Sequence, residues 1–134
     1  MIGVLIVTHG DIGTALLASA AQILGGAPAQ VLTLSVWRQD DPDDLILRGQ
    51  ELLEQLDAGD GVLVLTDIFG ATPGNVASRL LDDGHVEGVS GASLPMLLRV
   101  LTGRNGSLAG AVQRALSGGA EGVVHMNSDR CLDA

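Results

Sequence analysis

The chain has 134 residues, a length that suits one domain with a buried core. It contains no lysine, seven arginines and sixteen acidic residues, so its formal net charge is −9. This balance argues against nucleic acid as a partner, because phosphates are bound by positive surfaces. Trp37 and Phe69 are the only aromatic residues, although 46% of the chain is hydrophobic. We therefore expect a core of Val, Leu, Ile and Ala, as in a sheet covered by helices.

Features near the two ends of the sequence bear on the cellular location of the protein. The first apolar run stops after six residues and no basic segment precedes it, so we expect neither a signal peptide nor a membrane span. Cys131 is the only cysteine, which excludes an internal disulfide. We expect a soluble, cytoplasmic domain at 1–127 and a disordered tail at 128–134. No histidine pair has metal-ligand spacing, and neither a metal nor a cofactor is expected.

Strand-like and helix-like segments alternate along the chain, a pattern that predicts an α/β fold with a mainly parallel sheet. The apolar runs predict strands at 2–7, 31–36, 62–66, 86–89 and 122–126. Helices are expected at 12–24, from the acidic cluster at 40–44 to about 56, at 72–81, at 94–101, and after Ser107. Thr72 and Pro73 are the expected cap and first residue of the third helix.

Two of the predicted strands stop at polar side chains. The first strand is followed by Thr8, His9 and Gly10, and the third ends at Thr66 and Asp67. In open parallel sheets, ligands bind beyond the carboxyl ends of the strands, so we expect His9 and Asp67 at one edge. A hydrogen bond from one ring nitrogen to Asp67 would leave the other nitrogen free as a nucleophile. The alternative is that both residues are ordinary helix caps or loop groups.

The segment Gly70–Asn75 follows Asp67 and leads into a predicted helix. Backbone N–H groups at such a helix start can meet negative charge delivered to His9. The hydroxyl of Thr66 or Thr72 is suited to add a further donor. This loop is therefore a candidate binding element for an anionic group.

Other polar residues have ordinary structural explanations. His85 follows a turn and is expected in solvent, whereas His125 in the last predicted strand suits a structural or interface role. The acidic cluster at 40–44 either binds a cation or forms a solvated helix start, and we favour the second. Arg79 and Arg99 are suited to contact a phosphate but are expected to be surface charges of helices.

Several nucleotide and hydrolase motifs are missing. The GxxxxGK[ST] phosphate loop requires lysine, which the chain lacks, and no GxSxG sequence occurs. The spacing Gly10-x-x-Gly13 is only a fragment of a dinucleotide-binding motif. These absences and the scarcity of aromatic residues disfavour a nucleotide- or flavin-binding domain.

Three motifs occur in order along the chain: Thr8-His9-Gly10, the segment Val62–Arg79 that contains Asp67-Ile-Phe-Gly-Ala-Thr-Pro-Gly-Asn75, and Gly91-Ala-Ser-Leu-Pro-Met-Leu97. Together they resemble the IIA components of mannose-type phosphoenolpyruvate-dependent sugar phosphotransferase systems, over roughly residues 1–126. The resemblance implies a doubly wound, mainly parallel four-stranded sheet flanked by helices, with a C-terminal antiparallel strand.

The resemblance also implies a role for each residue of the site. His9 would take a phosphoryl group on Nε2 from the histidine-containing phosphocarrier protein and pass it to a separate IIB protein, while Asp67 holds Nδ1. The phosphoryl pocket would comprise Gly10, Gly70, Ala71, Thr72 and Asn75, and its rim Phe69, Pro95 and Met96. The protein would be a phosphotransferase and a homodimer that exchanges the strand at 122–126. It would associate with a membrane permease complex without entering the membrane.

Two departures from this family pattern concern the acceptor. No IIB domain follows within the 134 residues, so we expect the acceptor to be another polypeptide. Phe69 stands where some sugar-transporting members have an indole. The main alternative function is a regulatory binding module whose partners change when His9 is phosphorylated. A third is the phosphodonor module of dihydroxyacetone kinases, although the segment 67–75 favours the mannose type.

Overall fold

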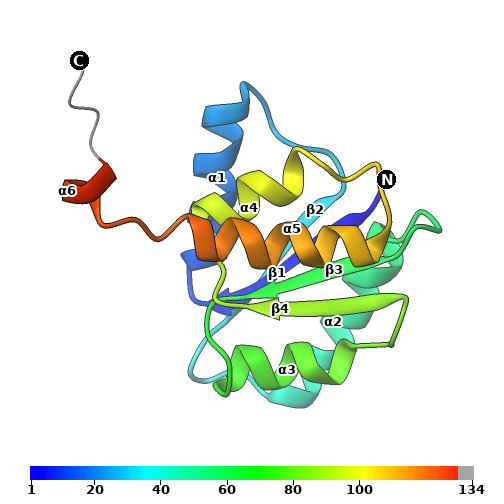
Figure 1. Cartoon of the computed structure of the whole chain (residues 1–134). Coiled ribbons are helices and arrows are strands. Elements are labelled where there is room, and N and C mark those ends of the chain that lie inside the picture. Colours follow the sequence, from blue (N-terminus) through cyan, green and yellow to red (C-terminus); the bar gives the residue numbers. More distant parts are fainter. Residues whose placement is uncertain (130–134) are drawn as a thin grey trace.

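Four parallel strands form the central sheet, in the spatial order β2-β1-β3-β4 (Figure 1). The structure, a computed structural model, describes residues 1–129. The strands are β1 (Gly3–His9), β2 (Val31–Val36), β3 (Val62–Thr66) and β4 (Val86–Ser90). The order reverses between β1 and β3, so this is the point where ligands bind in open α/β sheets.

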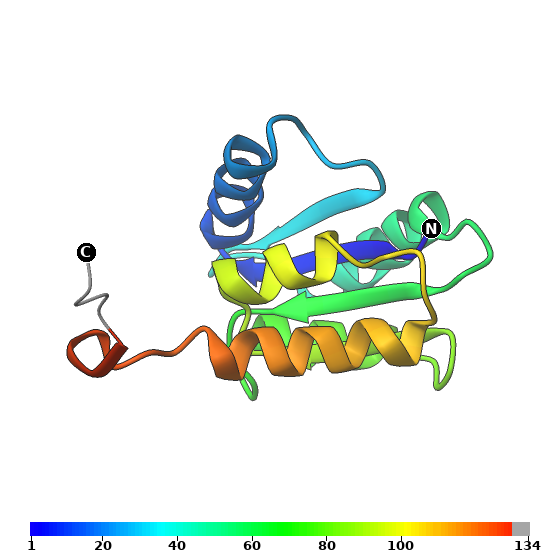
Figure 2. The same cartoon turned by 45° about the horizontal axis from the view of Figure 1, so that its top comes forward.

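Helices cover both faces of the sheet. They are α1 (Ile12–Leu24), α2 (Pro42–Leu56), α3 (Thr72–Leu80), α4 (Leu94–Leu101), α5 (Leu108–Glu121) and α6 (Met126–Asp129). Figures 1 and 2 show α1, α4 and α5 on one face and α2 and α3 on the other. The predicted doubly wound, four-stranded parallel α/β fold is therefore confirmed. Within residues 1–129, no helix has both the length and the apolar character needed to cross a membrane.

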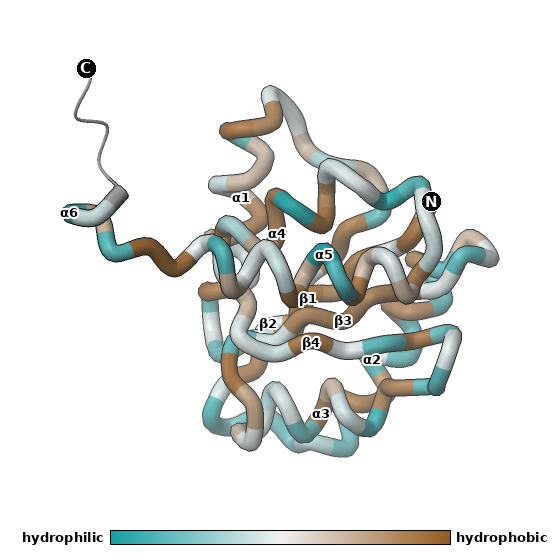
Figure 3. Tube along the Cα trace, viewed as in Figure 1, coloured by the Kyte–Doolittle hydropathy of each residue, from teal (hydrophilic) through white to brown (hydrophobic). Residues whose placement is uncertain are grey.

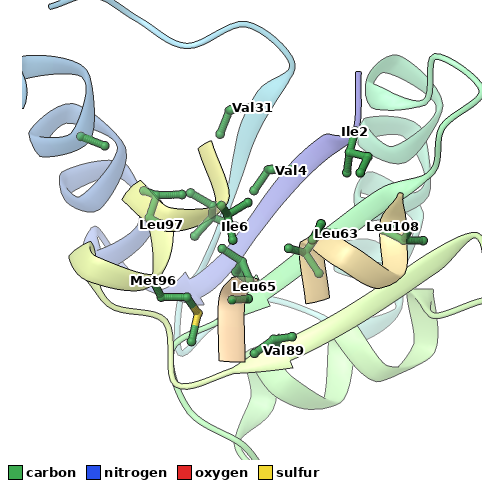
Figure 4. Close-up of a cluster of buried hydrophobic side chains, with 14 residues drawn as sticks. Ile2, Val4, Ile6, Val31, Leu63, Leu65, Val89, Met96, Leu97 and Leu108 are labelled. Atoms are coloured by element: carbon green, nitrogen blue, oxygen red, sulfur yellow. The ribbon is translucent and has the colours of Figure 1, made fainter. Parts of the chain in front are cut away.

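Alternating side chains of the strands build one hydrophobic core on each face. The face under α1, α4 and α5 buries Val4, Ile6, Leu63, Leu65, Met96 and Leu97, among others (Figure 4). The face under α2 and α3 buries Leu5, Val7, Val62, Val64, Val76 and Leu80. Because β1 and β3 are buried on both faces, their carboxyl ends are held in fixed positions relative to each other.

Short polar side chains and glycines set the ends of the helices. The Asp41 carboxylate accepts a hydrogen bond from the N–H of Asp43 at 3.0 Å, and Pro42 occupies the first turn of α2. The left-handed Gly25, with φ of 83°, ends α1. The N-cap of α3 is Ala71, so Thr72 lies inside the helix and not at the predicted cap position.

The predicted fifth strand at 122–126 is wrong for the single chain. After α5, residues 123–125 belong to neither helix nor strand, and Met126 begins α6. This arm extends away from the sheet (Figure 1), and Val123 is 86% exposed. A strand requires a neighbour for its backbone hydrogen bonds, and the arm leads away from the sheet and pairs with no strand of its own chain within residues 1–129. Residues 130–134 of the predicted tail lie outside the described residues.

Candidate active site

The strand register brings His9 and Asp67 together. The ladder between β1 and β3 ends with Val7 opposite Thr66, and β1 continues to His9 beside Val36 of β2. Asp67 directly follows Thr66 and therefore lies next to the last residues of β1. Two side chains separated by 58 positions in sequence thus meet at the carboxyl edge of the sheet.

Asp67 binds both the ring and the backbone of His9. Its Oδ2 atom lies 2.8 Å from His9 Nδ1 and accepts a hydrogen bond from the His9 N–H at 3.0 Å. Its Oδ1 atom accepts from the Ile68 N–H at 3.0 Å. The Asp67 side chain is 11% exposed, whereas the His9 side chain is 50% exposed. The carboxylate is thus held from three sides while the ring remains open to solvent.

These contacts determine the charge of Asp67 and the tautomer of His9. Burial disfavours the charged carboxylate, but hydrogen bonds from the His9 ring and backbone outweigh it, so the pKa of Asp67 lies below its usual value. An ionised carboxylate only accepts hydrogen bonds, so we assign the ring proton to Nδ1. The lone pair of Nε2 is then free, and this nitrogen is the nucleophilic atom of the site.

The turn after β1 depends on a glycine. Gly10 has φ of 45°, a left-handed conformation, and its N–H donates to the Val36 carbonyl at 2.9 Å. A Cβ atom on Gly10 would lie 3.0 Å from a ring carbon of Trp37. The Thr8 hydroxyl accepts a hydrogen bond from the Gly13 N–H at 2.7 Å, which fixes the start of α1. His9 is thus presented by a tight, well-connected turn.

His9 lines an open pocket of about 440 Å³ with Thr72 from the start of α3. The remaining lining residues come from the end of β2 and the start of α2: Val36, Trp37, Arg38, Asp40 and Pro42. Gly70 has φ of 89°, which turns the chain into α3. Within residues 1–129, the N–H groups of Gly70, Ala71 and Thr72 donate to no backbone carbonyl. The first turn of α3 therefore offers free donors beside the pocket.

Four other predicted site residues, Asn75, Phe69, Pro95 and Met96, do not line the His9 pocket. Asn75 lines the adjacent pocket of about 430 Å³, which shares Thr72 and Pro42 with the first. Phe69 is 81% exposed and lines a groove beside β4. Met96 is 4% exposed and packs within the core. Pro95 is exposed, and its side chain lies close to Gly122 at the end of α5.

Sequence reasoning missed Trp37 and Arg38. Both directly follow Val36, the last residue of β2, and both line the His9 pocket. The strand-end rule that identified His9 and Asp67 applies equally to β2, because its carboxyl end lies at the same edge of the sheet. Applied to that strand as well, the rule would have identified both residues.

A second histidine–aspartate pair lies at the opposite edge of the sheet. His85 Nε2 contacts Asp57 Oδ2 and joins the loop before β3 to the loop before β4. Hydrogen bonds from the Gly59 N–H and from His85 lower the pKa of Asp57. The described residues contain no group of three or more His, Cys, Asp or Glu side chains suited to hold a metal ion.

This site consists of an exposed histidine that an aspartate orients at the switch point of a parallel α/β sheet. Proteins of this class are suited to carry a covalently bound group on the histidine. Residues 3–116 match the family described as the PTS system fructose IIA component. The chain belongs to this family of IIA components of phosphotransferase systems, as the three motifs predicted. Membership supports a role in a sugar phosphotransferase system.

Curated relatives and solved structures agree with this assignment. The mannose-specific EIIAB component of Escherichia coli (strain K12) is 34% identical over 125 residues, which cover 91% of this chain but only 38% of that protein. The fructose-specific EIIA component of Bacillus subtilis (strain 168) is 32% identical over 76% of this chain and 70% of its own. The EIIA structure from Streptococcus agalactiae superposes with a TM-score of 0.84 at 26% identity, covering 96% of this chain and 99% of that one.

Proposed function

We propose that this protein is a phosphocarrier that accepts a phosphoryl group on Nε2 of His9 and passes it to a second protein. The observation that carries this proposal is the 2.8 Å contact between His9 Nδ1 and Asp67 Oδ2. It fixes a ring tautomer in which Nε2 is the free nitrogen, and the half-exposed ring presents that nitrogen to an incoming protein.

The transfer step forms one bond between phosphorus and nitrogen and breaks another, with groups that the two proteins supply. The Nε2 lone pair attacks phosphorus while the bond between phosphorus and a ring nitrogen of the donor histidine breaks. The donor ring keeps that electron pair and leaves as a neutral imidazole, because its other nitrogen carries a proton. The His9 ring gains positive charge and retains its Nδ1 proton, which Asp67 accepts in a hydrogen bond. The negative carboxylate therefore stabilises the ring most strongly once the phosphoryl group is attached.

The start of α3 supports an anionic group at this position. Phosphoryl transfer depends chiefly on in-line positioning and on stabilisation of charge over the phosphoryl oxygens. The positive end of a helix macrodipole and its free N–H groups meet both needs. Thr72 lines the pocket with His9, and its N–H donates to no backbone carbonyl within residues 1–129. We propose that the segment 70–75 binds the phosphoryl oxygens.

We propose the histidine-containing phosphocarrier protein as donor and a IIB protein as acceptor. The name of the Escherichia coli relative, an EIIAB component, supports a IIB acceptor, since IIA and IIB parts occur together in that protein. The names of these relatives carry two different sugars, mannose and fructose, so the proposal concerns the phosphoryl transfer and not one sugar.

A relay assay tests this function. Incubation with phosphoenolpyruvate and the general phosphotransferase proteins should give one phosphoryl adduct that is stable to alkali and labile to acid. Addition of a IIB protein should then remove the adduct from this chain and label the IIB protein. A chain that stays unmodified under these conditions would contradict the proposal. A stable adduct that no IIB protein discharges would contradict the acceptor step alone.

We also propose a homodimer that forms by exchange of the C-terminal arm. β4 is an edge strand, and a groove of about 330 Å³ lies beside it, lined by residues of α3, β4 and α5. Unpaired edges of this kind accept an added strand. The arm carries exposed apolar side chains, Val123, Val124 and Met126, which form a hydrophobic stretch beyond α5 (Figure 3). We propose that the arm of one copy covers the β4 edge of the other.

Val124→Asp should convert the dimer to a monomer, because a charge in the buried arm is costly without a partner. The measurement is the molar mass by size-exclusion chromatography with light scattering. Leu47→Asp is the matched control, since Leu47 is an exposed apolar residue of α2, on the opposite face of the sheet from α5. A monomeric mass for the unaltered chain, or an unchanged dimer in Val124→Asp, would refute arm exchange.

A further inference from the structure

Arg38 is the only basic side chain among the residues that line the His9 pocket. It directly follows the end of β2 and shares this pocket of about 440 Å³ with His9 and Thr72. The chain has a formal net charge of −9, and Asp40 also lines the pocket. A dianionic phosphoryl group on His9 would therefore lie among carboxylates, with Arg38 as the one side chain of opposite charge.

The other arginines of residues 1–129 have different positions or partners. Arg99 pairs with Glu121 at 2.8 Å, and Arg114 donates to the Arg99 carbonyl at 2.9 Å. Arg104 is buried and donates to the Ala29 carbonyl at 2.6 Å. Arg48 and Arg79 lie within α2 and α3 and line other pockets. Within the described residues, Arg38 takes part in no ion pair.

The loop that carries Arg38 is fixed by its own hydrogen bonds. The Trp37 N–H donates to Asp40 Oδ2 at 2.8 Å, and the Asp40 N–H donates to the Trp37 carbonyl at 3.0 Å. The Trp37 ring lies against Gly10, next to His9 in the chain. Asp40 is thus engaged by the backbone of the loop, and the loop is packed against the turn that presents His9. Arg38 thus extends from a fixed loop, lines the pocket and has no ion-pair partner within residues 1–129.

We propose that Arg38 binds the phosphoryl group while it is attached to His9. This inference rests on the proposed function and adds a binding residue to it. A guanidinium presents a planar fork of donors that matches two phosphoryl oxygens, and such charge-assisted bonds exceed neutral ones in strength. Arg38 would approach from the β2 side of the pocket, opposite the N–H groups of α3. Together they would surround the transferred group during its arrival and its departure.

A titration of the purified phosphoprotein by phosphorus NMR tests this contact. A bound guanidinium favours the dianion, so Arg38→Gln should shift the titration midpoint of the phosphoryl group to higher pH. The same variant should accept the phosphoryl group about tenfold more slowly, the loss expected for one charge-assisted hydrogen bond. The midpoint and rate of Arg38→Lys should lie between those of Arg38→Gln and the unaltered chain, because lysine keeps the charge but lacks the planar fork of donors.

Arg48→Gln is the matched control, because it removes the same charge from an exposed position outside the His9 pocket. Its titration midpoint should equal that of the unaltered chain. If the titration midpoint of Arg38→Gln also equals that of the unaltered chain, the inference is overturned. This holds even if the variant accepts the phosphoryl group more slowly, because Arg38 would then only attract the donor protein. Equal shifts in both variants would overturn it too, since net charge would then explain them. If the unaltered chain is never phosphorylated, the proposed function fails first.

Discussion

His9→Gln should accept no phosphoryl group from the phosphorylated donor. Glutamine keeps a polar side chain but has no nitrogen lone pair that can attack phosphorus, so the loss should be complete and not partial. The fold should persist, because the His9 side chain is half exposed at the end of β1. The measurement is the mass of the intact protein after incubation with phosphoenolpyruvate and the general phosphotransferase proteins, with circular dichroism to verify folding.

The second histidine–aspartate pair supplies the control for this substitution. His85 also contacts a carboxylate, that of Asp57, but it lies at the amino edge of the sheet, away from the start of α3. His85→Gln should therefore be phosphorylated at the rate of the unaltered chain. An adduct that survives in His9→Gln, or one that disappears only in His85→Gln, would assign the chemistry to a different residue.

Asp67→Asn should slow phosphorylation by about 100-fold while it leaves the fold intact. An asparagine amide can donate to Nδ1, which would place the ring proton on Nε2 and block the attacking nitrogen. It also removes the negative charge that stabilises the phosphorylated ring. Single-turnover transfer from the phosphorylated donor measures the effect, and Asp57→Asn is the matched control at the other edge. Equal rates for Asp67→Asn and the unaltered chain would exclude Asp67 from the mechanism.

The lowered pKa of Asp67 gives a second, independent readout. A carboxyl with a lower pKa in the folded state stabilises the fold above its unfolded pKa of about 3.9, and this contribution is lost as the pH falls through the folded value. Asp67→Asn should therefore have a weaker dependence of unfolding free energy on pH below about 4. Denaturant unfolding at a series of acidic pH values would show it. Parallel curves for the two proteins would contradict the hydrogen bonding assigned to Asp67.

The sequence predicted the part of the site that strand ends determine. The apolar runs of β1 and β3 must be buried on both faces, and this places His9 and Asp67 at one edge of a parallel sheet. No longer-range information is needed for that inference, because strand direction and burial are sufficient. The contact at 2.8 Å between the two side chains agrees with the expected pairing.

Features that depend on tertiary packing were predicted less well. Met96 stands beside Pro95 in the third motif, but its side chain is on the buried face of α4 and packs into the core. The predicted start of a helix does not show which of its side chains are buried. Residues 122–126 have the composition of a strand, but a strand also needs a neighbour, and in one chain they extend into solvent. Trp37 and Arg38 follow the end of β2, so the same strand-end rule would have identified them if it had been applied to that strand as well.

The central claim is that Nε2 of His9 carries the phosphoryl group, and nitrogen-15 NMR of the phosphorylated protein tests it most directly. We expect phosphorus to couple to Nε2 of His9, while Nδ1 keeps its proton in the hydrogen bond to Asp67. Coupling to Nδ1 of His9, or to a ring nitrogen of His85 or His125, would contradict it.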